Sequence, residues 1–486
     1  MARVLASPIG GRLARGAFWS LMGTALSKVL STVSWVIVGR MLGKTGFGEV
    51  GMIQNTVGIF GAAAGFGMGM AATKYVAEYR RTDPDRAGRF IALASAATWI
   101  TSGLLSLVLL LMSGWLARET LAAPHLAPLL QVSTLLLLFS GVTGAQTGAL
   151  SGFEAFKVIA RVNIIVGLLS FPCMVLGAWW GGVGGALWGL IASTLIGAVW
   201  NWTALRTEAR RAGVQVRYRG CWSEARVFWD FNLPGMLNTF FTALVVWAVG
   251  AILVRHADGF GGLGIYNAVQ RIRLIPENIA AMLLAPMLPV LSDSFARRDL
   301  AVYGKTLLFA YVVSCVVIIP LALLQMSAPW LTLLPYGRQF EGGDPNVVIW
   351  VMAWTISFAL TWPMGSILIS MGRIWFALAV GALSSVINLG LSAWLIPIMG
   401  AAGMALAAFA GMLVACVPCM VLLYRELPDL MRQIHWWTML GVTTLLVSAC
   451  VLASQYLAPL PACGVGIACS LLFLLWRLHP RTNRLA

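Results

Sequence analysis

The sequence predicts an all-α polytopic membrane protein, and three observations support this fold class: the composition, the length of the apolar stretches and the placement of the charges. The 486 residues are 59% hydrophobic and 10% charged, with a mean hydropathy of +0.85. A soluble globule of this length needs more polar surface. Stretches of about 20 apolar residues match the roughly 30 Å core of a bilayer, whereas barrel strands need only about 10.

About fourteen stretches in the hydropathy pattern reach this length. The loops that separate them are short, so none can hold a separate catalytic domain. We therefore predict transmembrane helices at 15–39, 47–72, 89–116, 127–151, 158–179, 183–205, 231–255, 264–290, 303–326, 344–371, 374–396, 400–424, 438–457 and 461–478.

The positive charges concentrate on one side of this predicted topology. Most of the 33 Lys and Arg residues fall in segments assigned to the inside. This is the positive-inside rule, so the net charge of +16 reflects topology and attraction to lipid headgroups, and no nucleic-acid partner is expected. Both termini are predicted to be cytoplasmic. Arg3, Arg12 and Arg15 precede the first span without a cleavage site, so we expect no removable signal.

Two motifs are repeated at nearly the same offset. The heptad Gly46–Met52 returns 213 residues later as Gly259–Ile265, and a G-x-x-G-x-A-L motif that begins at Gly181 returns 219 residues later at Gly400. Paired halves of this kind are typical of transporters. We therefore predict two pseudo-symmetric six-helix lobes at 1–205 and 231–425, a basic cytoplasmic linker at 206–230, and two additional helices with a cytoplasmic tail at 426–486.

Both heptads also match the dinucleotide fingerprint G-x-G-x-x-G. That fingerprint requires a preceding strand in a soluble βαβ unit, which the sequence does not predict. The glycines instead favour tight outer turns, where the chain re-enters the membrane. The histidines are scattered over different loops and the cysteines lack ligand spacing, so the sequence predicts no metal and no cofactor.

The first predicted span carries a polar stripe. Ser20, Thr24, Lys28, Ser31 and Trp35 recur every three or four residues and therefore share one helical face. A lysine at mid-span costs about 2.5–3.5 kcal/mol on insertion scales. Lys28 should therefore face a wet cavity or pair with an acid; a snorkelling or purely structural lysine is the alternative.

The eighth predicted span is the most polar. It contains Asn267, Gln270, Arg271, Arg273, Glu277 and Asn278. Arg273 and Glu277 have the i,i+4 spacing of a helical ion pair. No acid lies at that spacing from Arg271, and guanidinium groups suit phosphate oxygens. Glu49 lies in the corresponding span of the first half, and Pro234 and Pro276 could break their helices. The predicted cavity is net cationic.

The chain resembles the polysaccharide transporters of the multidrug and oligosaccharidyl-lipid exporter (MOP) superfamily, the Wzx-type flippases. The resemblance rests on Gly46–Met52, on Ala72–Tyr79, on Leu334–Phe340 and on Leu395–Gly403. It implies a MATE/MOP-like fold, a bacterial inner-membrane location and alternating-access export of undecaprenyl-pyrophosphate-linked oligosaccharide for O-antigen or exopolysaccharide synthesis. A polysaccharide polymerase or co-polymerase is the implied protein partner.

Under this resemblance the polar residues take specific roles. Lys28, Arg271, Arg273 and Asn267 would bind phosphate or acidic sugars, and Trp35 would stack on sugar. Glu49 and Glu277 would form ion pairs or a site that couples transport to an H⁺ or Na⁺ gradient. A lipid II flippase or a small-molecule antiporter of the same superfamily remains the alternative. An enzyme is not expected, because the outer loops are short and poor in acids.

Overall fold

A computed structural model describes residues 8–478, apart from 65–67, 226–232, 285–286, 288–290, 292–293, 295–298, 372 and 427–435. The last part of the linker and parts of the predicted helices 264–290 and 438–457 border on or fall in these gaps. All regular elements of the described residues are helical. The chain divides into two compact units, Met1–Arg255 and His256–Ala486.

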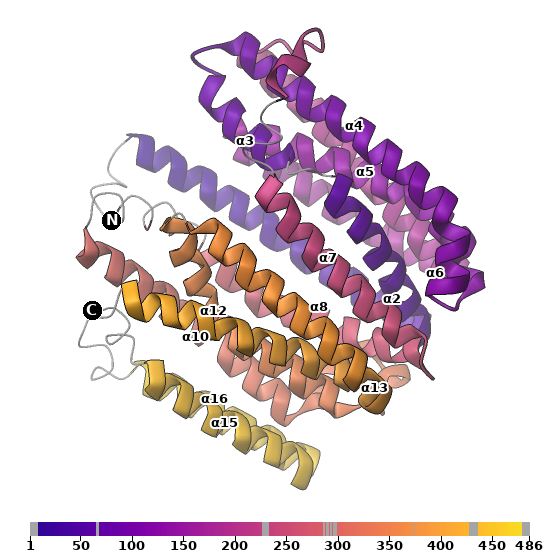
Figure 1. Ribbon diagram of the computed structural model, residues 1–486, viewed down its shortest axis with the longest axis vertical. Coiled ribbons are helices and arrows are strands. Elements are labelled where there is room, and N and C mark those ends of the chain that lie inside the picture. Colours follow the sequence, from indigo (N-terminus) through magenta and orange to yellow (C-terminus); the bar gives the residue numbers. More distant parts are fainter. Residues whose placement is uncertain are drawn as a thin grey trace. The chain divides into compact units, whose positions relative to one another are not determined.

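The first unit contains six α-helices joined by short helical turns. The α-helices are α2 (Pro8–Ala64), α3 (Met68–Tyr79), α4 (Pro84–Trp115), α5 (Ala127–Gly152), α6 (Phe156–Arg211) and α7 (Leu233–Val254). The turns are the π-helix η1 (Leu116–Thr120) and the 3-10 helices η2 (Pro124–Leu126) and η3 (Cys221–Glu224). α5 packs between α4 and α6 (Figure 1).

α7 packs against α2 in this unit. The Trp247 indole Nε1 donates a hydrogen bond to Thr56 Oγ1 at 3.2 Å, and Gly250 lies against the Met52 sulfur. The duplicated motifs make α7 the first helix of the predicted lobe 231–425, whereas its contacts are with the first unit. The lobe boundaries stay a prediction.

The repeated heptads lie in helices, so the predicted tight turns are misplaced. α2 breaks at Gly43, whose φ is 68°, and Gly46–Met52 continues as helix after that break. Gly259–Ile265 forms the first turns of α8. The turns therefore precede the heptads, and the glycines serve close packing instead: a Cβ on Gly46 would lie 3.2 Å from the Val183 side chain of α6.

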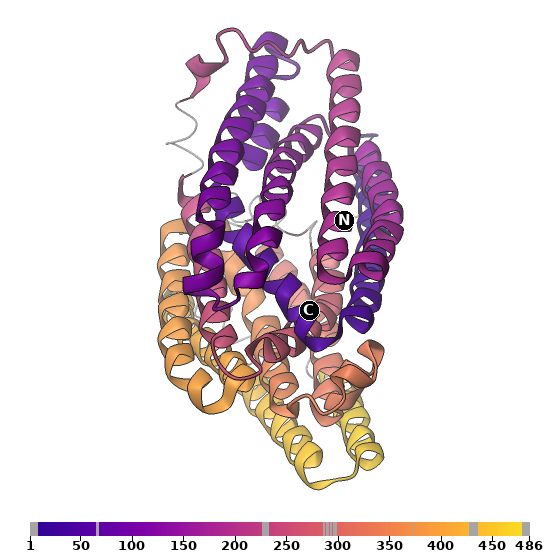
Figure 2. The same ribbon diagram turned by 90° about the vertical axis from the view of Figure 1, so that its right-hand side faces the viewer.

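The second unit contains α8 (Gly259–Leu284), α10 (Leu300–Ser327), α11 (Pro329–Leu333), η5 (Leu334–Tyr336), η6 (Arg338–Phe340), α12 (Pro345–Ser370), α13 (Ile374–Glu426), α15 (Trp436–Tyr456) and α16 (Pro459–Leu478). α10 packs against α8, α12, α15 and α16, and α12 packs against α13. α15 and α16 form a hairpin that is visible in both views (Figure 2).

The prolines expected to break helices do not do so. α8 runs continuously through Pro276, and Pro234 stands in the first turn of α7. A proline in the first turn removes no intrahelical hydrogen bond, because the N–H groups there have no helical acceptor.

Breaks occur instead at two glycines with the same backbone conformation. Gly182 interrupts α6 with φ 53° and ψ −132°, and Gly400 interrupts α13 with φ 56° and ψ −131°. Residues with a Cβ rarely adopt this region. Three residues further on, Gly185 and Gly403 each abut a carbonyl eight residues earlier in the chain, that of Gly177 or Leu395. The structural repeat offset at this motif is thus 218 residues, one less than the motif alignment indicates.

The described helices include five that are long and apolar enough to cross a membrane: Pro84–Thr120, Pro124–Gly152, Phe156–Arg211, Val302–Ser327 and Trp375–Glu426. The bent pair Leu26–Ala64 and Met68–Tyr79 makes a sixth if it forms one span. This is fewer than predicted, partly because α6 and α13 each cover two predicted stretches. The protein is a multi-pass, all-helical membrane protein.

Candidate functional site

The polar face of α8 forms the predicted ion pair. Arg273 Nη1 lies 3.1 Å from Glu277 Oε1, and the two side chains are only 11% and 10% exposed. The i,i+4 spacing on a continuous helix brings them together, as the sequence predicts. Taking both charges out of water carries a desolvation penalty of several kcal/mol per ion. Such a pair is weak as a stabilising element, and therefore points to another use.

An aromatic side chain from α12 completes the environment of Arg273. Its guanidinium carbon lies 4.0 Å from the centroid of the Trp354 ring, which in turn stacks on Phe358 at 5.2 Å. A guanidinium over an indole face gains cation–π attraction, which is larger when the pair is desolvated. Sequence reasoning missed Trp354, because nothing in a span rich in tryptophan marks one ring as the neighbour of a distant helix.

Several polar atoms of this face have unused hydrogen-bonding capacity. Gln270 Nε2 donates to the Tyr266 hydroxyl at 2.5 Å. Among the described residues, Gln270 Oε1, Asn267 Nδ2 and Arg273 Nε are buried without a hydrogen-bond partner. Unsatisfied buried groups cost about 1–3 kcal/mol each, so such a cluster is expected to meet water or a ligand. The half-buried Arg271 belongs to the same helix.

This arrangement suits a ligand that combines anionic and hydroxyl groups. Arg273 and Asn267 offer N–H donors, Gln270 offers an acceptor, and the aromatic pair offers an apolar face. Phosphate oxygens and sugars require these groups. The substrate-binding roles of Asn267, Arg271 and Arg273, and the ion-pair or coupling role of Glu277, remain predictions at this stage.

The predicted site residues of α2 lie in the first unit. The Lys28 side chain is exposed, and its carbonyl accepts a hydrogen bond from Thr32 Oγ1 at 2.9 Å. The Trp35 side chain is 5% exposed and packs edge to face on Phe47 at 5.9 Å. Its ring is covered in this conformation, so stacking on a sugar, which stays a prediction, would require the ring to become accessible.

Glu49 has a partner that the sequence did not suggest. Glu49 Oε1 lies 2.9 Å from His125 Nε2 on η2, with exposures of 16% and 61%. The adjacent turn η1 is also tied to α7, because Arg255 donates to the carbonyl of Glu119. His125 was set aside because the four histidines lie in different loops; only the packing of η2 against α2 reveals the pair. A coupling role for Glu49 stays a prediction.

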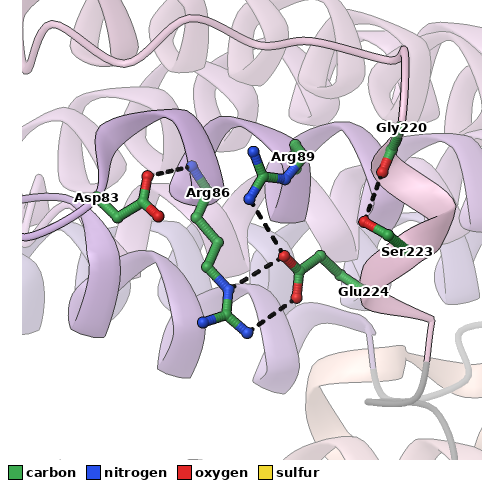
Figure 3. Close-up of polar contacts among 6 residues, drawn as sticks. All are labelled: Asp83, Arg86, Arg89, Gly220, Ser223 and Glu224. Atoms are coloured by element: carbon green, nitrogen blue, oxygen red, sulfur yellow. Dashed lines mark hydrogen bonds and ion pairs between the residues drawn. The ribbon is translucent and has the colours of Figure 1, made fainter.

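A second arginine–glutamate cluster attaches the linker to α4 (Figure 3). Glu224 of η3 accepts two hydrogen bonds from Arg86, both 3.1 Å, and a third from Arg89 at 3.4 Å. Asp83 caps the same helix by accepting from the Arg86 N–H at 2.9 Å. The linker is thus ordered against α4 up to residue 225, where the described segment ends.

The rest of the cluster is aromatic. The Arg86 guanidinium lies 4.4 Å from the Tyr79 ring centroid, and Tyr75, Tyr79 and Phe90 stack on one another. Cys221 beside Glu224 is 1% exposed and packs with Ala92 and Leu93. The charged groups that meet here are paired, so this cluster has the composition of a structural attachment.

Comparison with known proteins yields a family match and distant relatives. A family model described as "Polysaccharide biosynthesis protein" matches residues 13–295. The lipid II flippase MurJ of Bacillus subtilis (strain 168) is 22% identical over 460 residues, covering 86% of this chain and 84% of that protein. The lipid III flippase of Escherichia coli (strain K12) is 24% identical over 430 residues, covering 85% of this chain and 99% of that protein.

Solved structures show the same fold. An inward-facing multidrug resistance MATE family transporter of the MOP superfamily matches with a TM-score of 0.68 at 15% identity, over 86% of this chain and 99% of that chain. The predicted MATE/MOP-like, all-helical fold class is therefore confirmed. The relatives are flippases and transporters, in agreement with the expectation that the chain is not an enzyme.

Proposed function

Because this chain belongs to the polysaccharide biosynthesis protein family of the MOP superfamily, we propose that it is a flippase for lipid-linked oligosaccharide. The family match over residues 13–295 carries this proposal. The flippases among its relatives support it, since each spans most of the chain. A sugar chain on a phosphorylated lipid cannot cross hydrocarbon unaided, because its hydroxyls and charges would lose their hydration.

The finer proposal concerns the cargo and the location. The cargo is undecaprenyl-pyrophosphate-linked oligosaccharide for a surface polysaccharide, moved across the bacterial inner membrane by alternating access, with both termini cytoplasmic. The cationic character of α8 supports it: Arg271 and Arg273 share two helical turns with a single acid, Glu277. Lys28 adds a cation on α2. A pyrophosphate needs this sign of charge, whereas a cationic drug needs the opposite sign.

The proposed topology keeps fourteen transmembrane helices. α6 has 56 residues, which corresponds to about 84 Å of helix, more than twice the roughly 30 Å bilayer core. The breaks at Gly182 and Gly400 allow α6 and α13 to cross twice each, and the break at Gly43 does the same for α2. α15 and α16 supply the last two spans.

A lipid II flippase is the second candidate, and the Bacillus subtilis relative favours it. The two candidates differ in the phenotype of a deletion strain. Loss of surface polysaccharide, with undecaprenyl-linked oligosaccharide accumulating in the cytoplasmic leaflet, supports the oligosaccharide flippase. Accumulation of lipid II with failing cell-wall synthesis supports the second candidate. Unchanged lipid-linked pools, in a strain without a redundant transporter, contradict both.

A variant experiment tests the role of the cations. Lys28→Ala combined with Arg271→Ala is expected to abolish export without lowering membrane abundance, because phosphate charge would lose its counter-charges. The matched control is Lys305→Ala with Arg338→Ala, which removes one lysine and one arginine whose side chains are exposed on α10 and η6. Normal export in the first double variant, or equal loss in the control, contradicts the assignment.

A further inference from the structure

The second unit contains an apolar groove apart from the polar face of α8. The groove has a volume of about 600 Å³, within the roughly 300–1,000 Å³ of ligand sites. Its lining comes from three helices: α12 contributes Leu360 and Thr361, α13 contributes residues from Leu413 to Arg425, and α15 contributes Leu440. Leu413, Val417 and Val421 are exposed, so the groove opens to the surroundings of the protein.

The body of the groove suits hydrocarbon. Its few polar groups are satisfied within their own helices: Ser357 donates to the Ala353 carbonyl at 3.0 Å, Thr361 to the Ser357 carbonyl at 2.9 Å, and Cys416 to the Met412 carbonyl at 3.0 Å. They offer no donor to a ligand. The remaining lining is Leu, Val and Met. Burial of apolar surface is thus the main interaction available to an occupant.

One end of the groove is cationic. Arg425 and Tyr424 line it in the last turn of α13. The neighbouring acid, Glu426, is paired with Arg373 at 2.5 Å. Among the described residues no carboxylate pairs with Arg425, so this end carries one positive charge. A guanidinium at the end of an apolar groove is complementary to a phosphodiester attached to a hydrocarbon chain.

The length of the groove favours a phospholipid. Leu413 and Arg425 are twelve residues apart on one helix, about 18 Å, which is close to the roughly 15 Å of a single hydrocarbon leaflet. An undecaprenyl chain is far longer, and a pyrophosphate carries more charge than one arginine neutralises. We propose that this groove binds a glycerophospholipid with an anionic headgroup, its phosphate on Arg425 and an acyl chain along α12 and α13.

The experiment uses the full-length protein purified in a mild detergent. Native mass spectrometry measures binding of added phosphatidylglycerol, with zwitterionic phosphatidylethanolamine as the second probe. We expect preferential binding of phosphatidylglycerol, about tenfold weaker in Arg425→Ala because one charge-assisted contact is lost. Arg425→Lys should retain part of the affinity, and Val417→Trp should reduce binding by filling the groove with the charge intact. Arg338→Ala, a matched loss of an exposed arginine elsewhere in the unit, should change nothing.

Three results would overturn the proposal. They are equal binding by Arg425→Ala and Arg338→Ala, equal binding of the two phospholipids by the original protein, and a co-purified polyprenyl phosphate that occupies the groove instead. The last result would assign the groove to the tail of the transported lipid. The measurement involves no export, so its outcome is independent of the proposed flippase function.

Discussion

Two arginine–glutamate clusters in this protein have nearly the same closest distance and opposite degrees of satisfaction. In the first unit, Glu224 lies 3.1 Å from Arg86, receives hydrogen bonds through both carboxylate oxygens, and also contacts Arg89 (Figure 3). In the second unit, Glu277 lies 3.1 Å from Arg273. Among the described residues, neither of the two closest atoms of that pair has a hydrogen-bond partner.

The difference shows how a charge cluster can be assigned a role from its hydrogen bonds. The Glu224 cluster connects two segments and uses its acceptors on them, which stabilises the attachment of the linker to α4. The Glu277 cluster is more deeply buried, lies on one helix against Trp354, and retains unused donors and acceptors. Burial with unused capacity is characteristic of a ligand site more than of a structural contact.

The strongest test replaces both members of a pair. Arg273→Met with Glu277→Gln removes the charges without leaving either one unpaired, so membrane abundance should be retained. Export per molecule should fall about 100-fold or more, equivalent to roughly 2.8 kcal/mol of lost substrate interaction. The matched control is Arg86→Met with Glu224→Gln, which should export normally per folded molecule. Quantitative surface-polysaccharide assays normalised to membrane abundance measure both; equal loss in the two variants would remove the distinction.

A single substitution in the first cluster should affect stability. Glu224→Ala leaves Arg86 and Arg89 without their carboxylate and should destabilise the attachment of the linker by about 1–3 kcal/mol. Thermal unfolding of the purified variant measures this, and export per folded molecule should be unchanged. A transport defect at full stability would mean that the linker participates in the transport cycle.

The smallest expected effect concerns the ring against Arg273. Trp354→Leu should weaken export several-fold, because a cation–π contact contributes about 0.5–2 kcal/mol. Trp354→Phe keeps an aromatic face and should retain more activity. A Trp354→Leu variant that exports as well as the original protein would show that the ring only fills space beside the guanidinium.

The sequence predicts the candidate site where its members share one helix. The Arg273–Glu277 pair follows from i,i+4 spacing on a single span, and the structure confirms it. His125 beside Glu49, and Trp354 over Arg273, were missed because each contact joins segments distant in the chain. The glycine motifs were found, but the turns preceding the heptads and the one-residue shift at Gly400 required backbone angles.

The sequence by itself determined that this protein is helical and lies in a membrane, because hydropathy over about 20 residues depends on composition and not on neighbours. It also determined the internal duplication and the cationic character of α8. Only the tertiary structure decided which charges are satisfied, that the linker attaches to α4 through Glu224, and that a groove ends at Arg425. The physical reason is that hydrogen bonds and cavities depend on which helices become neighbours, and local sequence spacing does not encode that choice.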